Sequence, residues 1–306
     1  MVCGMSTAPR PRSPRTRSAP AAVLVAAALS ATALAGCDVG GIPAAGSDDG
    51  RLDVVAAPPA LLEVARRVGG DDVDAVGPAP SGVDVHDVEL TADQVARVVD
   101  ADVVVHVRHL APSVDDAVAL REGPGSLDVS QVDGAEEDDP HLWLDPVLLA
   151  RATVLVAAEL AEVDPQGADG YRRRADEVVA ELEALDEDLA AQLAPCRGAV
   201  LVTAHEAFGY LADRYGLEQV AITGIDPNVE PTPARLRDVA EQVRDAGVRT
   251  VFFDDVTSTG VAQALADEAG VSTSVLLPLE VSVDPDYGAA MRENGDALRA
   301  GLVCDG

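Results

Sequence analysis

Short apolar segments alternate with helical segments along two stretches of this 306-residue chain, and this alternation limits the folds that it can adopt. In the first stretch we predict three strands and two helices, at residues 52–57, 73–76 and 103–107 and at residues 61–68 and 91–99. Strands that alternate with helices form parallel sheets with helices on both faces. The first stretch therefore predicts one α/β lobe.

The alternation resumes after Pro195 and predicts a second α/β lobe. Its predicted strands cover residues 199–203, 220–222, 250–253 and 274–277, and its predicted helices cover residues 208–215, 233–246 and 261–268. The predicted fold class is therefore α/β, with two similar lobes that each consist of a parallel sheet flanked by helices. A cleft between two such lobes is a preferred place for a ligand.

A long helical stretch separates the two lobes. Residues 146–162 and 167–193 are both predicted helices, and in the second of them apolar residues recur every three or four positions from Val178 to Leu189. A helix of about 27 residues is about 40 Å long. We therefore expect this helix to join the two lobes as a rigid connection.

The N-terminal 36 residues have the layout of a secretory signal, because four arginines precede an apolar run at about residues 21–35 and no acidic residue occurs. The run is shorter than the roughly 20 apolar residues that cross a membrane. It ends in Leu34-Ala35-Gly36-Cys37, which resembles the bacterial lipobox, where the leader is removed and the cysteine receives lipid. We therefore expect a mature chain that begins at Cys37 and is anchored on the outer face of the cell membrane.

These patterns divide the chain into five parts. We predict a lipoprotein signal peptide at residues 1–36, a flexible tether at 37–50, an N-terminal lobe at 51–145, a helical segment at 146–195 and a C-terminal lobe at 196–306. The tether assignment rests on its small and polar composition, which leaves almost nothing to bury.

Acidic residues dominate the charge of the chain, with 53 Asp and Glu against 22 Lys and Arg and a formal net charge of −31. Phosphate backbones repel such a protein, so nucleic acid is not expected as a partner. An acidic surface raises the local concentration of cations. A generally acidic composition of the host's proteins explains the charge equally well.

Two of the four cysteines remain for the folded part of the mature protein. Cys3 leaves with the leader and Cys37 is the expected lipidation site, so Cys196 and Cys304 remain in an exported, oxidising compartment. We predict a disulfide between them, which closes a loop of more than 100 residues and contributes on the order of 4 kcal/mol in the chain-entropy model. Two unpaired thiols are the alternative.

Five histidines occur in the chain, and His86, His141 and His205 lie on segments that follow strands or open helices. Connecting segments of this kind carry most binding sites. His205 directly follows the strand predicted at residues 199–203, and the C-terminal ends of parallel strands are where α/β sheets bind ligands. Spacing alone leaves two interpretations open, a shared metal site and three unrelated surface histidines.

Several segments, taken in order, resemble the metal receptors of bacterial ABC importers, the zinc- and manganese-binding solute-binding lipoproteins. The resemblance extends over about residues 51–304. Five segments show it: Gly69-Gly70-Asp71-Asp72-Val73, residues 82–91 around Val85-His86-Asp87, His141-Leu142-Trp143-Leu144-Asp145-Pro146, residues 203–210 around Ala204-His205-Glu206, and residues 224–233. It implies that His86, His141 and His205 are metal ligands that converge at the interlobe cleft. It also implies a membrane permease as the partner that accepts the ion.

The resemblance implies a fourth ligand near the last strand of the second lobe. Some zinc-binding members of the family use the glutamate of a Pro-Leu-Glu segment, and Pro278-Leu279-Glu280 stands at that place. Other members use an aspartate two or three positions earlier, where this chain has Leu277 and Pro278. We therefore predict Glu280 as the fourth ligand. A solvated acid in an acidic protein is the alternative.

Three imidazoles and one carboxylate form a tetrahedral set that suits Zn²⁺ better than Mn²⁺, which prefers more oxygen ligands. Four protein ligands leave no open coordination position, which favours capture of the ion over catalysis. We therefore predict a monomeric zinc receptor that is not an enzyme. The alternatives are a manganese receptor, a three-histidine zinc hydrolase with Glu206 as its base, and a metal-dependent adhesin.

The remaining candidate residues have secondary roles. We predict that Asp254 and Asp255 orient a ligand histidine, with strand-end capping as the alternative. His106 and His109 are expected to cap or pack. Residues 123–140 lack apolar periodicity and contain an acidic run within 133–139, so they are predicted to form a mobile acidic loop in place of the histidine-rich loop of many zinc-binding relatives.

Overall fold

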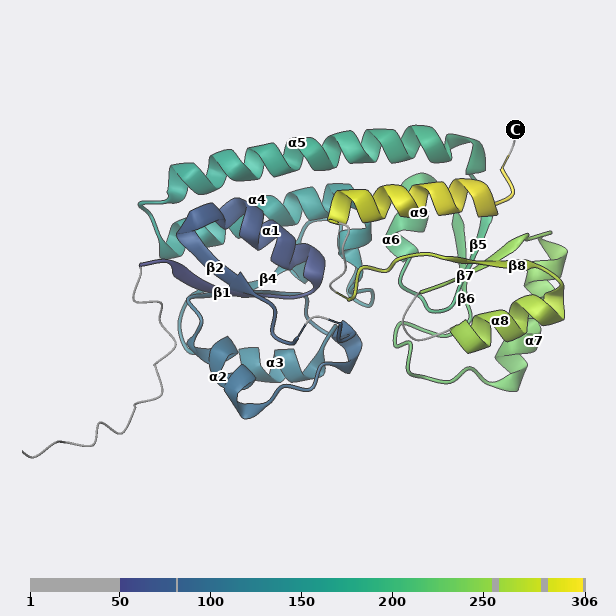
Figure 1. Cartoon of the computed structure of the whole chain (residues 1–306), viewed down its shortest axis with the longest axis horizontal. Helices are drawn as coiled ribbons and strands as arrows, with labels where there is room; N and C mark the ends of the chain where they lie inside the picture. Colours follow the sequence, from purple (N-terminus) through teal and green to yellow (C-terminus); the bar gives the residue numbers. More distant parts are fainter. Residues whose placement is uncertain (1–49, 81, 255–258, 282–285, 305–306) are drawn as a thin grey trace, which may run out of the picture. The chain divides into compact units, whose positions relative to one another are not determined.

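Two parallel sheets with the same strand order form the framework of the protein (Figure 1). The structure is a computed structural model that describes residues 50–80, 82–254, 259–281 and 286–304. In the first sheet the order is β2-β1-β3-β4, and in the second it is β6-β5-β7-β8. All neighbouring strands are parallel. The predicted fold class is therefore confirmed.

The strands have the following bounds: β1 (Leu52–Ala56), β2 (Val73–Val76), β3 (Val103–His106), β4 (Ser126–Asp128), β5 (Val200–Thr203), β6 (Glu218–Ala221), β7 (Thr250–Phe253) and β8 (Ser272–Val275). The helices are α1 (Pro59–Gly69), α2 (Ala92–Asp100), α3 (Pro112–Val118), α4 (Pro146–Val163), α5 (Ala168–Leu193), α6 (Gly209–Tyr215), α7 (Pro233–Asp245), α8 (Thr259–Ala269) and α9 (Tyr287–Gly301). Short 3-10 helices lie at η1 (Gly70–Asp72), η2 (Val85–Asp87), η3 (Val129–Gln131), η4 (Leu142–Leu144) and η5 (Ala194–Cys196). No helix in these described ranges is both long and apolar enough to cross a membrane.

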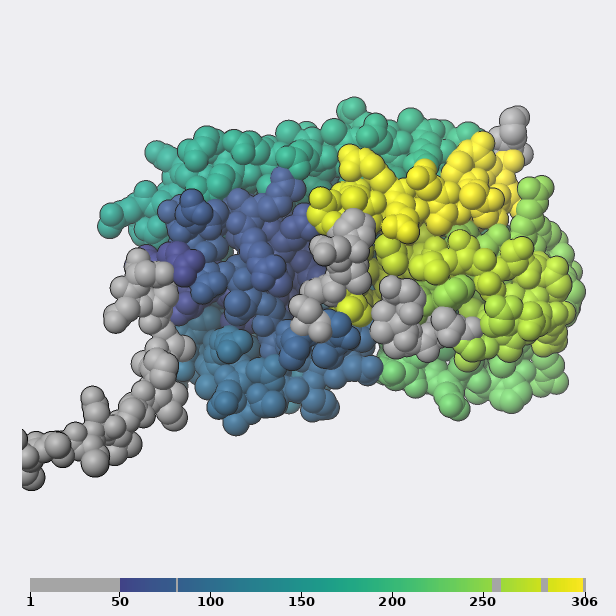
Figure 2. Space-filling view, viewed as in Figure 1, coloured from purple at the N-terminus to yellow at the C-terminus, as the bar shows by residue number. Residues whose placement is uncertain are grey.

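Helix α5 connects the two halves of the fold. It has 26 residues, and its buried side chains form one stripe that includes Tyr171, Val178, Leu185 and Leu193. It packs against α1 and α4 of the first half and against α6 and α9 of the second, and Figures 1 and 2 show α9 (yellow) beside it. One cluster of buried side chains continues from α1 through α4 and α5 to α6 and α9. This shared core restricts movements between the halves to small ones.

The disulfide predicted between Cys196 and Cys304 is present in the structure, where it joins residues 108 positions apart. Cys196 is the last residue of η5, directly after α5, and Cys304 follows α9. The bond therefore fastens the C-terminal helix to the end of the connecting helix. Residues 1–49 lie outside the described residues, and with them the predictions for the leader, the lipidated Cys37 and almost all of the tether.

The segment at residues 123–140 contains more regular structure than its sequence pattern predicts. Residues 123–140 contain the short strand β4, which pairs with β3, and the 3-10 helix η3. The Tyr210 hydroxyl also accepts a hydrogen bond from the Glu136 N–H at 2.6 Å and donates one to the Asp139 carbonyl at 3.0 Å. The sequence analysis did not predict β4 and η3, because such short elements produce no periodic pattern, whereas the acidic run within 133–139 lies in a loop as predicted. The mobility of this loop stays a prediction. The predicted lobe boundaries stay a prediction, because one cluster of buried side chains extends through both halves of the fold.

Candidate metal centre

Four side chains from four separate segments meet at one point. The ligand atoms of His86, His141, His205 and Glu280 all lie within 4.8 Å of one another. His86 belongs to η2, His141 precedes η4, His205 follows β5, and Glu280 lies beyond β8. The structure thus brings together the four residues predicted as ligands. Their role as ligands stays a prediction, whereas their convergence is an observed feature of the fold.

Four of the six distances between the donor atoms are close to those of a tetrahedral site. Glu280 Oε1 lies 2.9 Å from His141 Nε2 and 3.2 Å from the Nε2 atoms of His86 and His205. The Nε2 atoms of His86 and His141 are 3.4 Å apart. Zinc bonds of about 2.0 to 2.1 Å place tetrahedral ligand atoms about 3.3 to 3.4 Å from one another. The four distances lie within about 0.5 Å of this value, and all donor pairs lie within 4.8 Å, so these residues fit a tetrahedral zinc ion once the donors adjust.

Tight local turns present His86 and His141. The Asp84 carboxylate accepts a hydrogen bond from the His86 N–H at 2.9 Å, and the Asp84 carbonyl accepts one from the Asp87 N–H at 3.1 Å. Asp139 Oδ1 accepts hydrogen bonds from both the N–H of His141 at 2.9 Å and its Nδ1 at 2.7 Å. In both cases the aspartate carboxylate accepts a hydrogen bond from the backbone N–H two residues later, which closes a tight turn.

Two carboxylates hold the rings of His141 and His205 from behind. Asp139 Oδ1 accepts from Nδ1 of His141, and Asp254 Oδ2 accepts from Nδ1 of His205 at 3.0 Å. Each contact fixes the tautomer that leaves Nε2 free for a metal. The structure places Asp254 where an orienting residue was predicted, while Asp255 lies outside the described residues. Asp139 is not recognisable from the sequence, because it is one of several acidic residues within 133–139.

Trp143, the single tryptophan of the chain, connects the segments of His141 and Glu280. Its Nε1 donates to the Pro278 carbonyl at 2.8 Å, and its ring centroid lies 5.3 Å from that of His141. Leu279, between Pro278 and Glu280, has a φ of 60°, a left-handed conformation that costs energy for a residue other than glycine. The Trp143 hydrogen bond helps to hold this conformation and so directs the Glu280 carboxylate toward the histidines.

Burial and hydrogen bonding oppose each other in the pKa values of the site. Burial lowers the pKa of His205, but hydrogen bonds to Asp254 and Glu280 outweigh it and raise that pKa to about 10. Burial likewise lowers the pKa of His141, which hydrogen bonds to Asp139 and Glu280 raise above its ordinary value. Burial raises the pKa of Glu280, yet hydrogen bonds from the three imidazoles hold it well below its usual range. A bound dication would replace the protons that these imidazoles share with the carboxylate.

The other candidates lie outside this group. His106 Nδ1 is 3.5 Å from Asp115 Oδ1, and the His109 N–H donates to Asp115 Oδ2 at 2.9 Å. Both histidines therefore contact the first turns of α3, in agreement with a packing or capping role. Burial lowers the pKa of His106 despite the nearby Asp128 and Asp115. Glu206, the base of the hydrolase alternative, is exposed.

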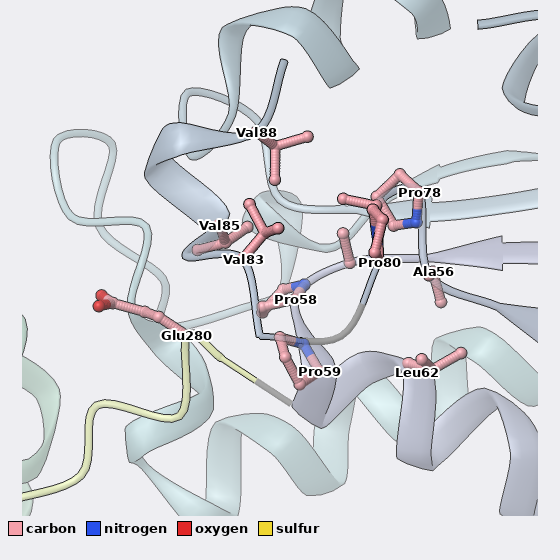
Figure 3. A pocket seen from close by; sticks show the side chains of 13 residues that line it. Ala56, Pro58, Pro59, Leu62, Pro78, Pro80, Val83, Val85, Val88 and Glu280 are labelled. Atoms are coloured by element: carbon pink, nitrogen blue, oxygen red, sulfur yellow. The ribbon is translucent and has the colours of Figure 1, made fainter. Parts of the chain in front are cut away.

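An apolar pocket lies beside the site, between α1 and the segment that carries His86. Its volume is about 40 Å³. It is lined mainly by apolar side chains, among them Pro58, Pro59, Pro78, Pro80, Val83, Val85 and Val88. Figure 3 shows the Glu280 carboxylate pointing away from these prolines. Glu280 also lines this pocket, which therefore borders the polar site from behind the His86 segment.

Comparison with protein families gives a match over most of the chain. The model of a family described as "Zinc-uptake complex component A periplasmic" (ZnuA) matches residues 54–301. The high-affinity zinc uptake system protein ZnuA of Bacillus subtilis is 30% identical over 288 residues, which cover 85% of this chain and 90% of that protein.

Two solved structures show the same fold. The laminin-binding protein Lmb of Streptococcus agalactiae, described as bifunctional with adhesin and metal transporting activity, superposes with a TM-score of 0.75 at 31% identity and covers 82% of this chain and 99% of that one. The Zn(II)-bound ZnuA-like domain of Streptococcus pneumoniae AdcA has a TM-score of 0.71 at 30% identity, with the same coverage of 82% and 99%.

Proposed function

This chain belongs to the ZnuA family of zinc-uptake components, and we propose that it captures Zn²⁺ outside the cell and delivers it to an ABC-type importer in the membrane. The resemblance found in the sequence motifs is thereby confirmed at the level of the family. One observation carries the proposal, namely that three imidazole nitrogens and one carboxylate oxygen converge from four segments to within 4.8 Å of one another. A matched relative named for zinc uptake and a matched Zn(II)-bound structure support zinc as the ion.

In this proposal His86, His141, His205 and Glu280 are the ligands, and Asp139 and Asp254 orient two of the rings. A set of three nitrogens and one oxygen favours Zn²⁺ over Mn²⁺, which prefers more oxygen donors. The ligands come from both halves of the chain, so a bound ion draws the halves together. The shared core and α5 keep this movement small, and the metal-loaded form is the one that docks on the permease.

Capture is favoured over catalysis for two reasons. Four protein ligands complete a tetrahedral zinc site, whereas catalytic zinc keeps one position for water. Glu206, the base that a hydrolase would need, is exposed and does not belong to the converging group. We therefore propose a receptor that is not an enzyme and acts as a monomer.

The proposed location is the outer face of the cell membrane. The arginine-rich leader and the Leu34-Ala35-Gly36-Cys37 segment support export followed by lipid attachment at Cys37. Anchoring holds the receptor close to a permease in the same membrane, which raises the rate at which the two meet.

Growth under zinc limitation tests the transport proposal. Cells without this gene are expected to stop growing when a chelator removes free zinc, and added Zn²⁺ but not Mn²⁺ should restore growth. The wild-type gene should also restore it, whereas a gene with His86, His141 and His205 replaced by alanine should not. Equal growth of deleted and parental cells at every chelator concentration would refute a role in zinc import.

Adhesion is a second candidate function, because the matched Streptococcus agalactiae protein is described as an adhesin as well as a metal transporter. Binding of the purified zinc-loaded protein to immobilised laminin is the direct measurement. Saturable binding that chelation abolishes would establish this function, and its absence would leave transport alone.

A further inference from the structure

His86 is held less firmly than the other three ligands. The ring of His141 is hydrogen-bonded to Asp139, and that of His205 to Asp254. Within the described ranges, Nδ1 of His86 has no such carboxylate partner, and its side chain is the most exposed of the four, at 8% against 2% or less. A ligand without an orienting hydrogen bond on its second nitrogen turns more easily away from a metal.

The segment around His86 has room to move. Val83, Val85 and Val88 line the apolar pocket together with prolines of neighbouring segments (Figure 3). At one end of the segment Gly82 has a φ of +89°, and a Cβ added there would meet no atom within 4 Å. Unfilled space behind a segment and open space around its first residue both leave room for a small displacement.

One polar contact ties this segment to the second half of the chain. The Asn228 side-chain amide donates to Asp87 Oδ1 at 2.7 Å, and the two residues are 141 positions apart. Asp87 is the neighbour of His86 in η2. Asn228 lies on the connection between β6 and α7, so this contact spans the two halves next to the site.

The connection that carries Asn228 is fastened near His205. The Glu206 N–H donates to the Gly224 carbonyl at 3.0 Å, and the Thr223 hydroxyl donates to the Ala204 carbonyl at 3.1 Å. The far end is fixed where the Thr232 side chain caps α7. Asn228 is therefore held by a segment that moves with His205, while Asp87 moves with His86.

We propose that Asn228 is a positioning residue that acts through Asp87 to keep His86 on the ion, so that this hydrogen bond sets the rate of metal release. When the bond opens, the His86 segment moves into the free space behind it and the ion loses its first ligand. This inference rests on the proposed function, because it assumes that the four converging residues bind Zn²⁺. If this hydrogen bond is present in the metal-loaded protein and breaks only when the ion leaves, its removal changes the dissociation rate of Zn²⁺ more than the association rate.

Dissociation kinetics of the full chain test the inference. The Zn²⁺-loaded protein is mixed with excess EDTA, and the release of the ion is followed in a stopped-flow instrument. Asn228→Ala is expected to release Zn²⁺ about three to ten times faster than wild type, in keeping with the loss of one exposed hydrogen bond to a charged group. The association rate and the urea midpoint of the metal-free protein are expected to stay unchanged. Val229→Ala, an exposed neighbour in the same connection, is the matched control and should release at the wild-type rate.

A reciprocal exchange separates the hydrogen bond from other effects of the substitution. Asn228→Asp places two carboxylates together and should release faster than Asn228→Ala. The double variant Asp87→Asn, Asn228→Asp restores an amide–carboxylate pair with the partners exchanged, and it should return to within about twofold of the wild-type rate. The inference would be overturned if Asn228→Ala released Zn²⁺ at the wild-type rate, or if the double variant released Zn²⁺ as fast as Asn228→Asp. A wild-type protein that binds no Zn²⁺ would instead refute the proposed function itself.

Discussion

Replacement of Glu280 by alanine is expected to weaken Zn²⁺ binding about 100-fold or more. Structural zinc sites with four protein ligands contribute about 10 to 16 kcal/mol in total, so one ligand accounts for about 3 kcal/mol, and each 1.4 kcal/mol is a factor of ten. Glu280 is also the one formal negative charge among the four donors, and it lies within 3.2 Å of all three Nε2 atoms. Its loss leaves three neutral ligands and a position that water can occupy.

Calorimetric titration of metal-free protein with Zn²⁺ measures this effect. Glu206→Ala is a suitable control, because Glu206 is an exposed acid next to the ligand His205 and carries the same charge. Its affinity should equal that of wild type. If Glu280→Ala bound Zn²⁺ as tightly as wild type, the closed four-ligand site would be wrong, and the hydrolase alternative with a zinc-bound water would return.

Removal of the disulfide is expected to lower the free energy of unfolding by about 4 to 5 kcal/mol. Cys196 and Cys304 are 108 positions apart, and the chain-entropy model gives about 4.7 kcal/mol for a loop of roughly 100 residues. Cys196 is fully buried in the shared core, and serine at that position adds the cost of burying a hydroxyl. The loss should release α9 from α5 and weaken the packing between the two halves.

Urea denaturation of metal-free protein measures this loss in a variant that carries Cys196→Ser and Cys304→Ser. A reductant should shift the wild-type midpoint toward that of the variant and leave the variant itself unchanged. Equal midpoints for wild type and variant in oxidising buffer would show that the bond does not stabilise the fold.

The elements that the sequence predicts well are those with strong periodic patterns. The buried stripe of α5 and the apolar runs of β1, β3, β5 and β7 are all found, with bounds that differ by at most one residue. Helix α3 is missed because only two of its seven residues, Val114 and Ala117, are buried, whereas the equally short α6 buries four. Strand β4 is missed because it has only three residues. Short elements contain too few positions to display a period.

Helix α9 is missed for a different reason. Its buried face includes Gly295 and the amide Asn294, whose side chain hydrogen-bonds both the N–H and the carbonyl of Leu277. A Cβ at Gly295 would lie 2.6 Å from the side chains of Leu189 and Gln192, so the close approach of α9 to α5 requires glycine there. Polar and small residues at core positions hide an amphipathic pattern.

For the site as well, local sequence patterns predict only some of the features, and contacts between distant residues are not predicted. Positions after strands and before helices mark the three histidines as candidates, whereas their assignment to one site, like that of Glu280, depends on the family resemblance. Asp139 cannot be distinguished within an acidic run. The hydrogen bonds from Trp143 to Pro278 and from Asn228 to Asp87 join residues 135 and 141 positions apart, and no local pattern of the sequence contains such contacts.

Titration of metal-free protein with Zn²⁺, beside a variant with His86, His141 and His205 all replaced by alanine, tests the central claim most directly. We predict that the wild-type protein binds one ion per chain with a dissociation constant below about 10 nM, as expected for a preformed site of four protein ligands. The triple variant should fold, as judged by its urea midpoint, and bind no ion in this range. Unchanged tight binding of one ion by a folded triple variant would contradict the account.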